Sequence, residues 1–363
     1  MSDSDSGHPI QVALVVLLLV GGGWYFFNHY KIDGLDQVSV YPKDEIADDT
    51  YISYQDAPLS LGSVSPQTAS VVGYPQAAEN PFTFTRASNQ SSSLETDSNP
   101  RPIYRNVKIA SWAMDGFGPT KLASGIVQKN LARVIRQFDV VALQQIASIE
   151  RDLVPRMVEL INQGDRRYDF VMGQSTGPKN RQEQLAFIFD TTRLQVDRRQ
   201  TYTLEDPANQ IAFDPLVAWF RSVGPPSSQA WTFSLVNFRI DLARAPSEVA
   251  LLRETLSAIR GDGRGEDDVV LAGLFQADDA YLVPSLGGDH FKAAVRTHPT
   301  DIFGRYQTCN IMMDSQSTTE FLGRGGVYDY QRVHDLTLSE AESVTSHLPV
   351  YAEFTAWEGG RLQ

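Results

Sequence analysis

From Arg105 onward, short apolar runs of strand length alternate with longer runs in which apolar residues recur every three or four positions. The short runs predict β-strands, and the longer runs predict amphipathic helices. The alternation lacks the strict strand-helix-strand repeat of a doubly wound parallel sheet, so it favours two packed sheets with helices on the outside. Strands are expected at residues 107–114, 140–143, 185–189, 216–220, 233–238, 269–272, 311–313 and 350–354.

Amphipathic patterns predict three helices among these strands. Their apolar faces contain, in chain order, Leu131, Val134, Ile135 and Phe138; Leu153, Met157, Leu160 and Ile161; and Val249, Leu252, Leu256 and Ile259. A fourth, short helix is expected around residues 339–344. Thr120 is the expected N-cap of the first helix, and Gly164 is expected to end the second. The third helix is expected to begin at Pro246 and to stop at Gly261. Residues 323–326 are expected to form a glycine-rich turn.

The N-terminal part of the chain carries one long apolar run. Ile10 to Phe27, IQVALVVLLLVGGGWYFF, is uncharged and approaches the roughly 20 residues that a membrane-spanning helix needs. A cleaved signal peptide is the competing interpretation, but residues 1–9 are polar and acidic, and no A-x-A-like cleavage site follows the run. We therefore expect residues 10–29 to anchor a single-pass membrane protein. Lys31 is the only positive residue nearby, so the side of the membrane stays open.

Composition divides the rest of the chain. Residues 30–102 are rich in Ser, Pro, Gln, Asn and Asp and show no helical or strand period, which predicts a linker. Residues 38–41 could still add an edge strand. The folded domain is expected at residues 103–357, followed by a tail at residues 358–363.

Charge and cysteine content limit the classes of function. The formal net charge of -13 makes non-specific nucleic-acid binding an unfavourable interpretation, because such binding depends on Lys and Arg side chains that neutralise phosphates. A local basic cleft remains compatible with this charge. The one cysteine, Cys309, cannot form an internal disulfide or a thiolate cluster.

The apolar run Val269 to Ala272 predicts a strand buried on both faces, and the sequence continues as GLFQADD. This stretch resembles the GDFNAD signature of the endonuclease/exonuclease/phosphatase superfamily, the deoxyribonuclease I-like fold. Five further motifs match in the family's order: IASWAMDGFG, LQQI, KNRQEQLAFIFD with SLVNFRID, TCNIMMD and SHLP. The resemblance implies an α+β fold, a four-layer α/β/β/α sandwich of roughly 250 residues. It also implies a site for phosphodiester hydrolysis with a divalent metal.

The resemblance indicates which positions would serve that chemistry, and most of them carry a different residue here. The substituted positions are Ala113, Gln145, Arg239, Leu274, Cys309 and Ser346. Gln145 keeps a carbonyl oxygen but lacks the charge of the family's Glu, and Gln276 is a milder replacement of Asn. Glu183, Asn310 and His347 are retained. Because Mg²⁺ requires hard oxygen ligands, we expect no metal, no other cofactor and no catalysis.

Three functional hypotheses follow from this pattern. The first is a membrane-anchored pseudoenzyme that acts in binding or scaffolding, with an unknown protein or a phosphate-bearing ligand as its partner. The alternative is a nuclease or phosphodiesterase that holds Mg²⁺ through relocated ligands, namely Asp278, Asp279, Gln145 and His347, with Asp115 or Asp241. The third is an anion-binding module that uses Arg239, Arg181 and His347.

The same residues also have ordinary structural roles open to them. Arg239 could pair with Glu183. The acidic pair at residues 278–279 could cap a turn or face solvent. Cys309 is expected to be a small buried hydrophobe, since no base adjoins it in the sequence. His347 could be a hydrogen-bonded structural histidine.

Overall fold

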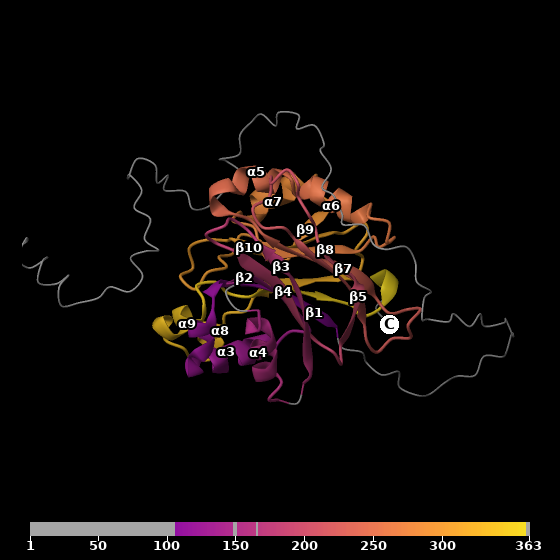
Figure 1. Ribbon diagram of the computed structural model, residues 1–363. Helices are drawn as coiled ribbons and strands as arrows, with labels where there is room; N and C mark the ends of the chain where they lie inside the picture. Colours follow the sequence, from indigo (N-terminus) through magenta and orange to yellow (C-terminus); the bar gives the residue numbers. More distant parts are fainter. Residues whose placement is uncertain (1–105, 148–150, 165, 361–363) are drawn as a thin grey trace, which may run out of the picture. The chain divides into compact units, whose positions relative to one another are not determined.

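The computed structural model describes residues 106–147, 151–164 and 166–360, which form two packed β-sheets with helices on both outer faces (Figure 1). The expected membrane anchor and the expected linker lie outside these residues. Within the described ranges, no helix combines the length and the apolar character needed to cross a membrane. The described fold continues through Gly360, past the expected domain boundary at residue 357.

The first sheet is mixed. Strands β1 and β2 run parallel, and the other neighbouring strands run antiparallel. In spatial order the strands are β11 (Phe321–Val327), β12 (Val350–Phe354), β1 (Val107–Phe117), β2 (Val140–Ala147), β4 (Glu183–Asp190) and β3 (Tyr168–Thr176). The apolar runs at residues 107–114 and 140–143 therefore form two central strands, as predicted.

The second sheet is also mixed, with β7 and β8 as its parallel pair. In spatial order its strands are β5 (Leu194–Thr203), β6 (Leu216–Ser222), β7 (Thr232–Arg239), β8 (Val269–Leu274), β10 (Cys309–Asp314) and β9 (Phe291–Ala293). Every residue of β8 is buried. This confirms the fully buried strand that the sequence predicts at residues 269–272.

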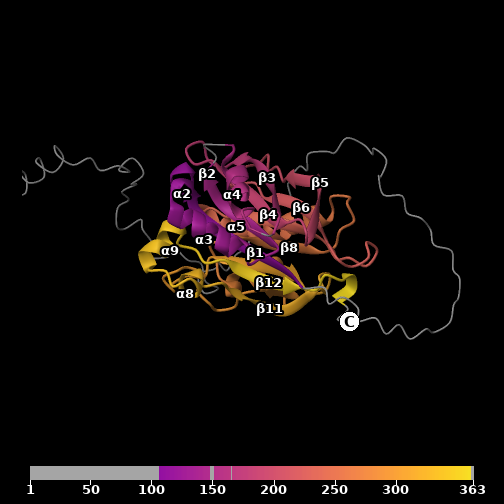
Figure 2. The same cartoon turned by 90° about the horizontal axis from the view of Figure 1, so that it is seen from below.

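Three apolar clusters hold the layers together. One lies between the two sheets, one lies between the first sheet and its helices, and one lies between the second sheet and its helices. The first sheet is covered by α2 (Pro119–Ala123), α3 (Gly125–Ile135), α4 (Leu153–Ile161), α8 (Tyr330–Val333) and α9 (Leu338–Val344). The second is covered by α5 (Ala245–Ala250), α6 (Leu252–Arg260) and α7 (Asp279–Leu286). Figure 1 shows the two groups of helices on opposite faces of the α+β sandwich, and Figure 2 shows the helices of the first sheet from below.

Helix starts differ from the sequence prediction near Thr120. The sequence places an N-cap at this residue, whereas Thr120 lies inside α2, whose N-cap is Gly118. The N-cap of α3 is Ser124. Pro119 accounts for the extra short helix, because proline lacks a backbone N–H and is favoured at the first helical position.

Helix ends also differ. Helix α3 ends at Ile135, before Phe138, and α4 ends at Ile161, before Gly164. The third expected helix is divided at Leu251 into α5 and α6. The apolar period continues across this division, so the pattern alone could not reveal it. Gly261 follows the end of α6 as the C-cap, as predicted.

Residues 323–326 are not a turn, as the sequence suggested, but part of β11. A Cβ atom on Gly325 would lie 2.7 Å from the carbonyl oxygen of Ala294 and 2.9 Å from that of Tyr351. Glycine is needed at this position because neighbouring backbones approach it closely.

Candidate functional site

The motif residues gather where the central strands of both sheets end. In the second sheet, Leu274 at the end of β8 pairs with Arg239 of β7 and with Cys309 of β10. In the first sheet, Ala113 lies in β1 and Gln145 lies in the neighbouring β2. The apolar cluster between the sheets includes Ala113, Leu274 and Cys309. The sequence motifs thus meet at one end of the sandwich.

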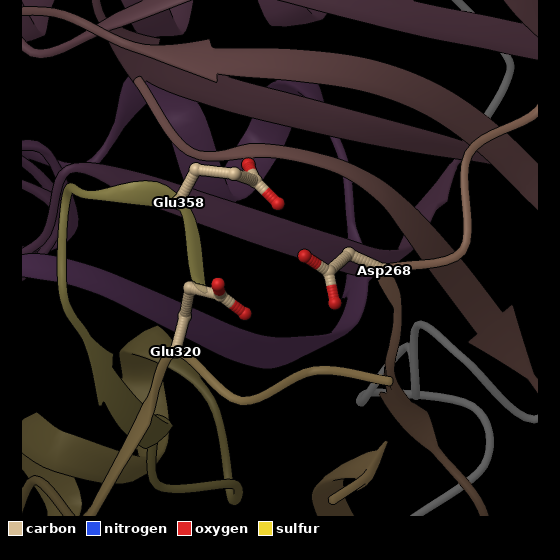
Figure 3. Close-up of side chains that lie close together, drawn as sticks. All are labelled: Asp268, Glu320 and Glu358. Atoms are coloured by element: carbon tan, nitrogen blue, oxygen red, sulfur yellow. The ribbon is translucent and has the colours of Figure 1, made fainter. Parts of the chain in front are cut away.

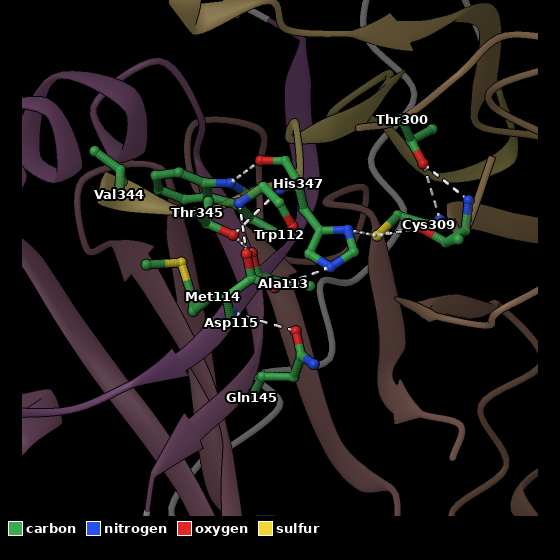
Figure 4. Close-up of polar contacts among 12 residues, drawn as sticks. Trp112, Ala113, Met114, Asp115, Gln145, Thr300, Cys309, Val344, Thr345 and His347 are labelled. Carbon is green, nitrogen blue, oxygen red and sulfur yellow. Dashed lines mark hydrogen bonds and ion pairs between the residues drawn. The ribbon is translucent and has the colours of Figure 1, made fainter. Parts of the chain in front are cut away.

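A row of three side chains lies at this end (Figure 4). The Nε2 atom of His347 lies 3.2 Å from Oδ1 of Asp115, and its Nδ1 atom lies 3.9 Å from Sγ of Cys309. The second carboxylate oxygen of Asp115 accepts a hydrogen bond of 2.5 Å from the backbone N–H of Ser346. Ser346 thus contacts this carboxylate through its backbone, and the histidine contacts a carboxylate from β1.

His347 and Asp115 form an ion pair. Burial alone lowers the pKa of His347, but the Cys309 sulfur and the Asp115 carboxylate raise it to about 10. Burial alone raises the pKa of Asp115, whereas the hydrogen bond and the charge of His347 lower it overall. His347 is therefore protonated at neutral pH, where a protonated imidazole cannot act as a general base.

The backbone of His347 is held from both sides. Its carbonyl oxygen accepts a hydrogen bond of 2.9 Å from the indole N–H of Trp112. Its own N–H donates to the hydroxyl of Thr345 over 3.2 Å, and that hydroxyl donates to the carbonyl oxygen of Ala113 over 2.8 Å. These bonds fix the loop before β12 against β1.

Asp115 and Gln145 sit in a strained part of the site. Their φ angles are 49° and 59°, in the left-handed region that residues other than glycine rarely adopt. The N–H of Asp115 donates to Oε1 of Gln145 over 3.3 Å, and Nζ of Lys121 donates to the carbonyl oxygen of Asp115 over 3.1 Å. Gln145 thus uses its carbonyl oxygen to support the turn that presents Asp115. The Asp-Gly pair at the end of the predicted strand was the available signal for that turn.

Three substituted positions extend the core into this end of the sandwich. The side chains of Ala113, Leu274 and Cys309 are fully buried. None of them carries an oxygen that could bind Mg²⁺. Cys309 is buried as expected, yet it lies beside His347, from which 38 residues of sequence separate it. Because the thiol has no exposed surface, it cannot attack a substrate in this conformation.

Arg239 and Glu183 form the ion pair that the structural interpretation anticipated. Nε of Arg239 lies 3.0 Å from Oε2 of Glu183, and the guanidinium also donates to the carbonyl oxygen of Ile240. The ring centre of Phe213 lies 4.7 Å from the guanidinium carbon. The two charged side chains are only 5% and 7% exposed, so Arg239 does not present its charge to solvent.

The other acidic residues considered as relocated metal ligands have structural partners. Asp278 is the N-cap of α7, Asp279 accepts a hydrogen bond from the N–H of Thr297, and Asp241 lies 2.8 Å from Arg181. Around the histidine, the described part of the chain brings no three His, Cys, Asp or Glu ligand atoms within 4.8 Å of one another. Of the proposed relocated ligands, His347, Asp115 and Gln145 therefore lie together at this point.

Two amide residues of the motifs, Asn310 and Gln276, form hydrogen bonds with backbone groups. The side chain of Asn310 accepts a hydrogen bond from the N–H of Val295 over 3.1 Å and donates to its carbonyl oxygen over 2.9 Å. Gln276 has a φ of 56°, and its own N–H donates to the carbonyl oxygen of Thr308 over 3.1 Å. The retained Asn310 is thus engaged within the fold.

The sequence is similar to those of known nucleases. It is 22% identical to deoxyribonuclease gamma of Mus musculus over 265 residues, which cover 67% of this chain and 83% of that protein. It is 24% identical to deoxyribonuclease-1 of Ovis aries over 272 residues, which cover 69% of this chain and 100% of that protein. No family model matches the chain.

A structural comparison agrees with the sequence similarity. D. rerio TDP2, in its complex with a single strand DNA product, matches with a TM-score of 0.50 at 16% identity, over 69% of this chain and 99% of that chain. Two mixed sheets between layers of helices define the protein as an α+β sandwich. With the sequence similarity, this fold supports the resemblance to the endonuclease/exonuclease/phosphatase superfamily, the deoxyribonuclease I-like proteins.

Proposed function

We propose that this protein is a membrane-anchored member of the superfamily that lacks metal-dependent phosphodiester hydrolysis and acts by binding or scaffolding. The set of side chains at the strand ends carries the proposal. Leu274, Ala113 and Cys309 continue the apolar core there, and Arg239 neutralises Glu183. Hydrolysis with Mg²⁺ needs hard oxygen ligands around an open coordination position, and these residues supply none.

Residual metal-dependent hydrolysis is the second candidate, and the Asp115 carboxylate favours it. That carboxylate is engaged by His347 and by the N–H of Ser346. The carbonyl oxygen of Gln145 accepts the N–H of Asp115. One carboxylate and one neutral oxygen, both occupied, form a weak ligand set, so the binding function is the stronger proposal.

The proposed partner is an unknown protein or a phosphate-bearing ligand. The net charge of -13 argues against a general affinity for nucleic acid. Arg239 is an unsuitable phosphate contact because Glu183 and Phe213 enclose its guanidinium. The protonated His347 contacts Cys309, one of the substituted motif positions, and its side chain is 13% exposed.

A hydrolysis assay on the full chain, purified in detergent, tests the loss of catalysis. DNA, RNA and a model phosphodiester are incubated with Mg²⁺ or Mn²⁺, and we expect no product above a matched reaction with EDTA. Preparations of Asp115→Asn and of the exposed control Glu159→Gln reveal any contaminating nuclease, whose activity would be equal in all of them. Metal-dependent cleavage that Asp115→Asn abolishes and Glu159→Gln retains would overturn the proposal.

The membrane anchor is tested separately. Its support is the uncharged run Ile10 to Phe27. After cell breakage and extraction with alkaline carbonate, we expect the full chain in the membrane pellet and a variant lacking residues 10–27 in the supernatant. Recovery of the full chain in the supernatant would refute the anchor and leave the proposed loss of catalysis unaffected.

A further inference from the structure

Three carboxylates converge at the opposite end of β8 from the candidate site (Figure 3). Asp268 immediately precedes β8, Glu320 immediately precedes β11, and Glu358 begins the turn of 3-10 helix after β12. One oxygen of each lies within 4.8 Å of the others. Asp268 is only 2% exposed and Glu320 only 1% exposed, while Glu358 lies at the surface. The cluster is thus a pocket of negative charge with one exposed member.

Two of these carboxylates have an oxygen without a protein partner. Oδ2 of Asp268 accepts a hydrogen bond of 2.9 Å from the indole N–H of Trp231, but Oδ1 accepts none from any described residue. Oε1 of Glu320 accepts the N–H of Gly359 over 2.6 Å, while its Oε2 is likewise without a partner in residues 106–147, 151–164 and 166–360. Unsatisfied buried oxygens of this kind indicate a missing ligand.

The arrangement of the charges strengthens this indication. Two of the three carboxylates, Asp268 and Glu320, are buried, and one oxygen of each lies within 4.8 Å of an oxygen of Glu358. Buried carboxylates that face one another require a proton or a cation between them.

We propose that Asp268, Glu320 and Glu358 bind a divalent cation with the size and chemistry of Ca²⁺. Calcium accepts carboxylate oxygens at about 2.3–2.6 Å in flexible geometry, so two oxygens of its shell can stand up to about 5 Å apart. The separation of at most 4.8 Å between the three oxygens fits that shell. Mg²⁺ suits the cluster less well, because it demands a smaller octahedral shell and releases its waters reluctantly.

The bound cation would connect segments that are distant in sequence. Asp268 leads into the second sheet, whereas Glu320 and Glu358 flank strands of the first sheet. The backbone N–H groups of Gly359 and Gly360 already bond to Glu320, so the ion would also fix the C-terminal turn. A ligand that binds the folded state and not the unfolded chain stabilises the fold.

The test is a calcium titration of the full chain after treatment with a chelator, followed by thermal unfolding. The matched variants are Glu320→Gln and Asp268→Asn, with Glu159→Gln as an exposed control. At a hundredfold excess of Ca²⁺ over its Kd, we expect the unfolding midpoint of the wild type and the control to rise by roughly 5–10 °C. We expect no rise in the two cluster variants. Without calcium, Glu320→Gln should unfold no earlier than the wild type, because the substitution removes a repelling charge.

Terbium luminescence gives a direct measurement of binding that does not depend on stability. Tb³⁺ replaces Ca²⁺ at oxygen sites and emits when a nearby tryptophan is excited, and Trp231 bonds to Asp268. We expect emission from the wild type and from Glu159→Gln that calcium displaces, and none from Glu320→Gln. An unchanged wild-type midpoint at about 10 mM Ca²⁺, above the range of weak calcium sites, would overturn the proposal. Equal emission from wild type and Glu320→Gln would overturn it as well.

Discussion

At the C-terminal end of β8, Leu274 lies among charges that are matched, whereas at the N-terminal end Asp268 lies among charges of one sign. Near Leu274, Arg239 faces Glu183, and a second ion pair joins Asp115 to His347. Near Asp268, the neighbouring side chains are Glu320 and Glu358. The resemblance to the family implies a metal at the Leu274 end. In this chain, however, the buried carboxylate oxygens without a hydrogen-bond partner among the described residues belong to Asp268 and Glu320, at the Asp268 end.

This difference shows that a metal site should be inferred from the unpaired charges of the folded protein, and not from the position of a sequence motif alone. At the Leu274 end, the buried Arg239 is paired with Glu183, and His347 is paired with Asp115, so these charges need no ion to balance them. At the Asp268 end, the fold retains two buried carboxylates with unsatisfied oxygens. Buried charges of this kind are costly unless something pairs with them. We therefore expect substitutions at the two ends to respond differently to metal and to pH.

The largest effect is expected at the matched end. Arg239→Ala leaves the buried Glu183 with only the longer contact to Arg181, whose Nε lies 3.8 Å from Oε1 of Glu183. The substitution should lower the free energy of unfolding by about 3–5 kcal/mol, measured by urea denaturation. The matched control is Arg239→Met combined with Glu183→Gln, which removes both charges and should recover most of the loss. A cost below about 1 kcal/mol for Arg239→Ala would show that the pair is exposed to solvent in solution.

The next effect concerns pH at the unmatched end. The pKa of Asp268 rises from 3.8 to about 8 on folding, chiefly through burial and then through Glu320, so its proton favours the folded state. This contribution is complete below pH 3.8 and is lost as the pH rises towards 8. We expect the metal-free protein to lose on the order of 2–3 kcal/mol over this range relative to Glu320→Gln, measured by urea denaturation in EDTA. Parallel pH profiles for the two proteins would contradict this expectation.

A smaller effect is expected at the ion pair of His347. Two groups contact this ring, Cys309 and Asp115, and the ammonium of Lys121 bonds to the backbone carbonyl oxygen of Asp115. Because the pKa of His347 is raised to about 10, its stabilising contribution is complete below pH 6.5 and is lost as the pH rises through 10. Asp115→Asn should lower this pKa, which an NMR titration of the ring would measure. The substitution should also lower the free energy of unfolding by about 1–2 kcal/mol at pH 7. An unchanged pKa in Asp115→Asn would remove Asp115 as the cause.

The smallest effect is expected at a surface ion pair, which sets the baseline for both ends. Nε of Arg324 lies 3.0 Å from Oε2 of Glu353, and the arginine side chain is 59% exposed. Water and salt screen such a pair, so Arg324→Ala should cost less than about 1 kcal/mol in the same urea assay. A cost as large as that of Arg239→Ala would mean that burial does not determine the strength of these pairs.

Much of the fold could be predicted because its central strands are buried on both faces. Runs such as Val269 to Ala272 contain only apolar residues, and they have one plausible structure at that length. Strands β3 and β5 were missed because they are partly exposed and rich in polar residues, as in the run DRRQTY of β5. Segments of that kind resemble loops in a sequence, and only pairing with a neighbouring strand makes them regular.

The sequence predicted where the candidate site lies, but it did not predict which side chains contact one another there. Motif residues at strand ends meet because parallel strands finish at one edge of a sheet, and this places Leu274 beside Arg239. The contact between Asp115 and His347 depends on a backbone turn with a φ of 49°, which the sequence indicates only through the following glycine. Asp268, Glu320 and Glu358 each resemble a solvated loop residue, and only the folded chain brings them together.

The measurement that tests this account most directly is a calorimetric titration of the chelator-treated full chain with Ca²⁺. It compares the wild type with Asp115→Asn at the matched end and with Glu320→Gln at the unmatched end. The account predicts a single bound ion in the wild type and in Asp115→Asn, and none in Glu320→Gln. Loss of binding in Asp115→Asn together with full binding in Glu320→Gln would place the metal at the strand ends of the motifs and would contradict the account.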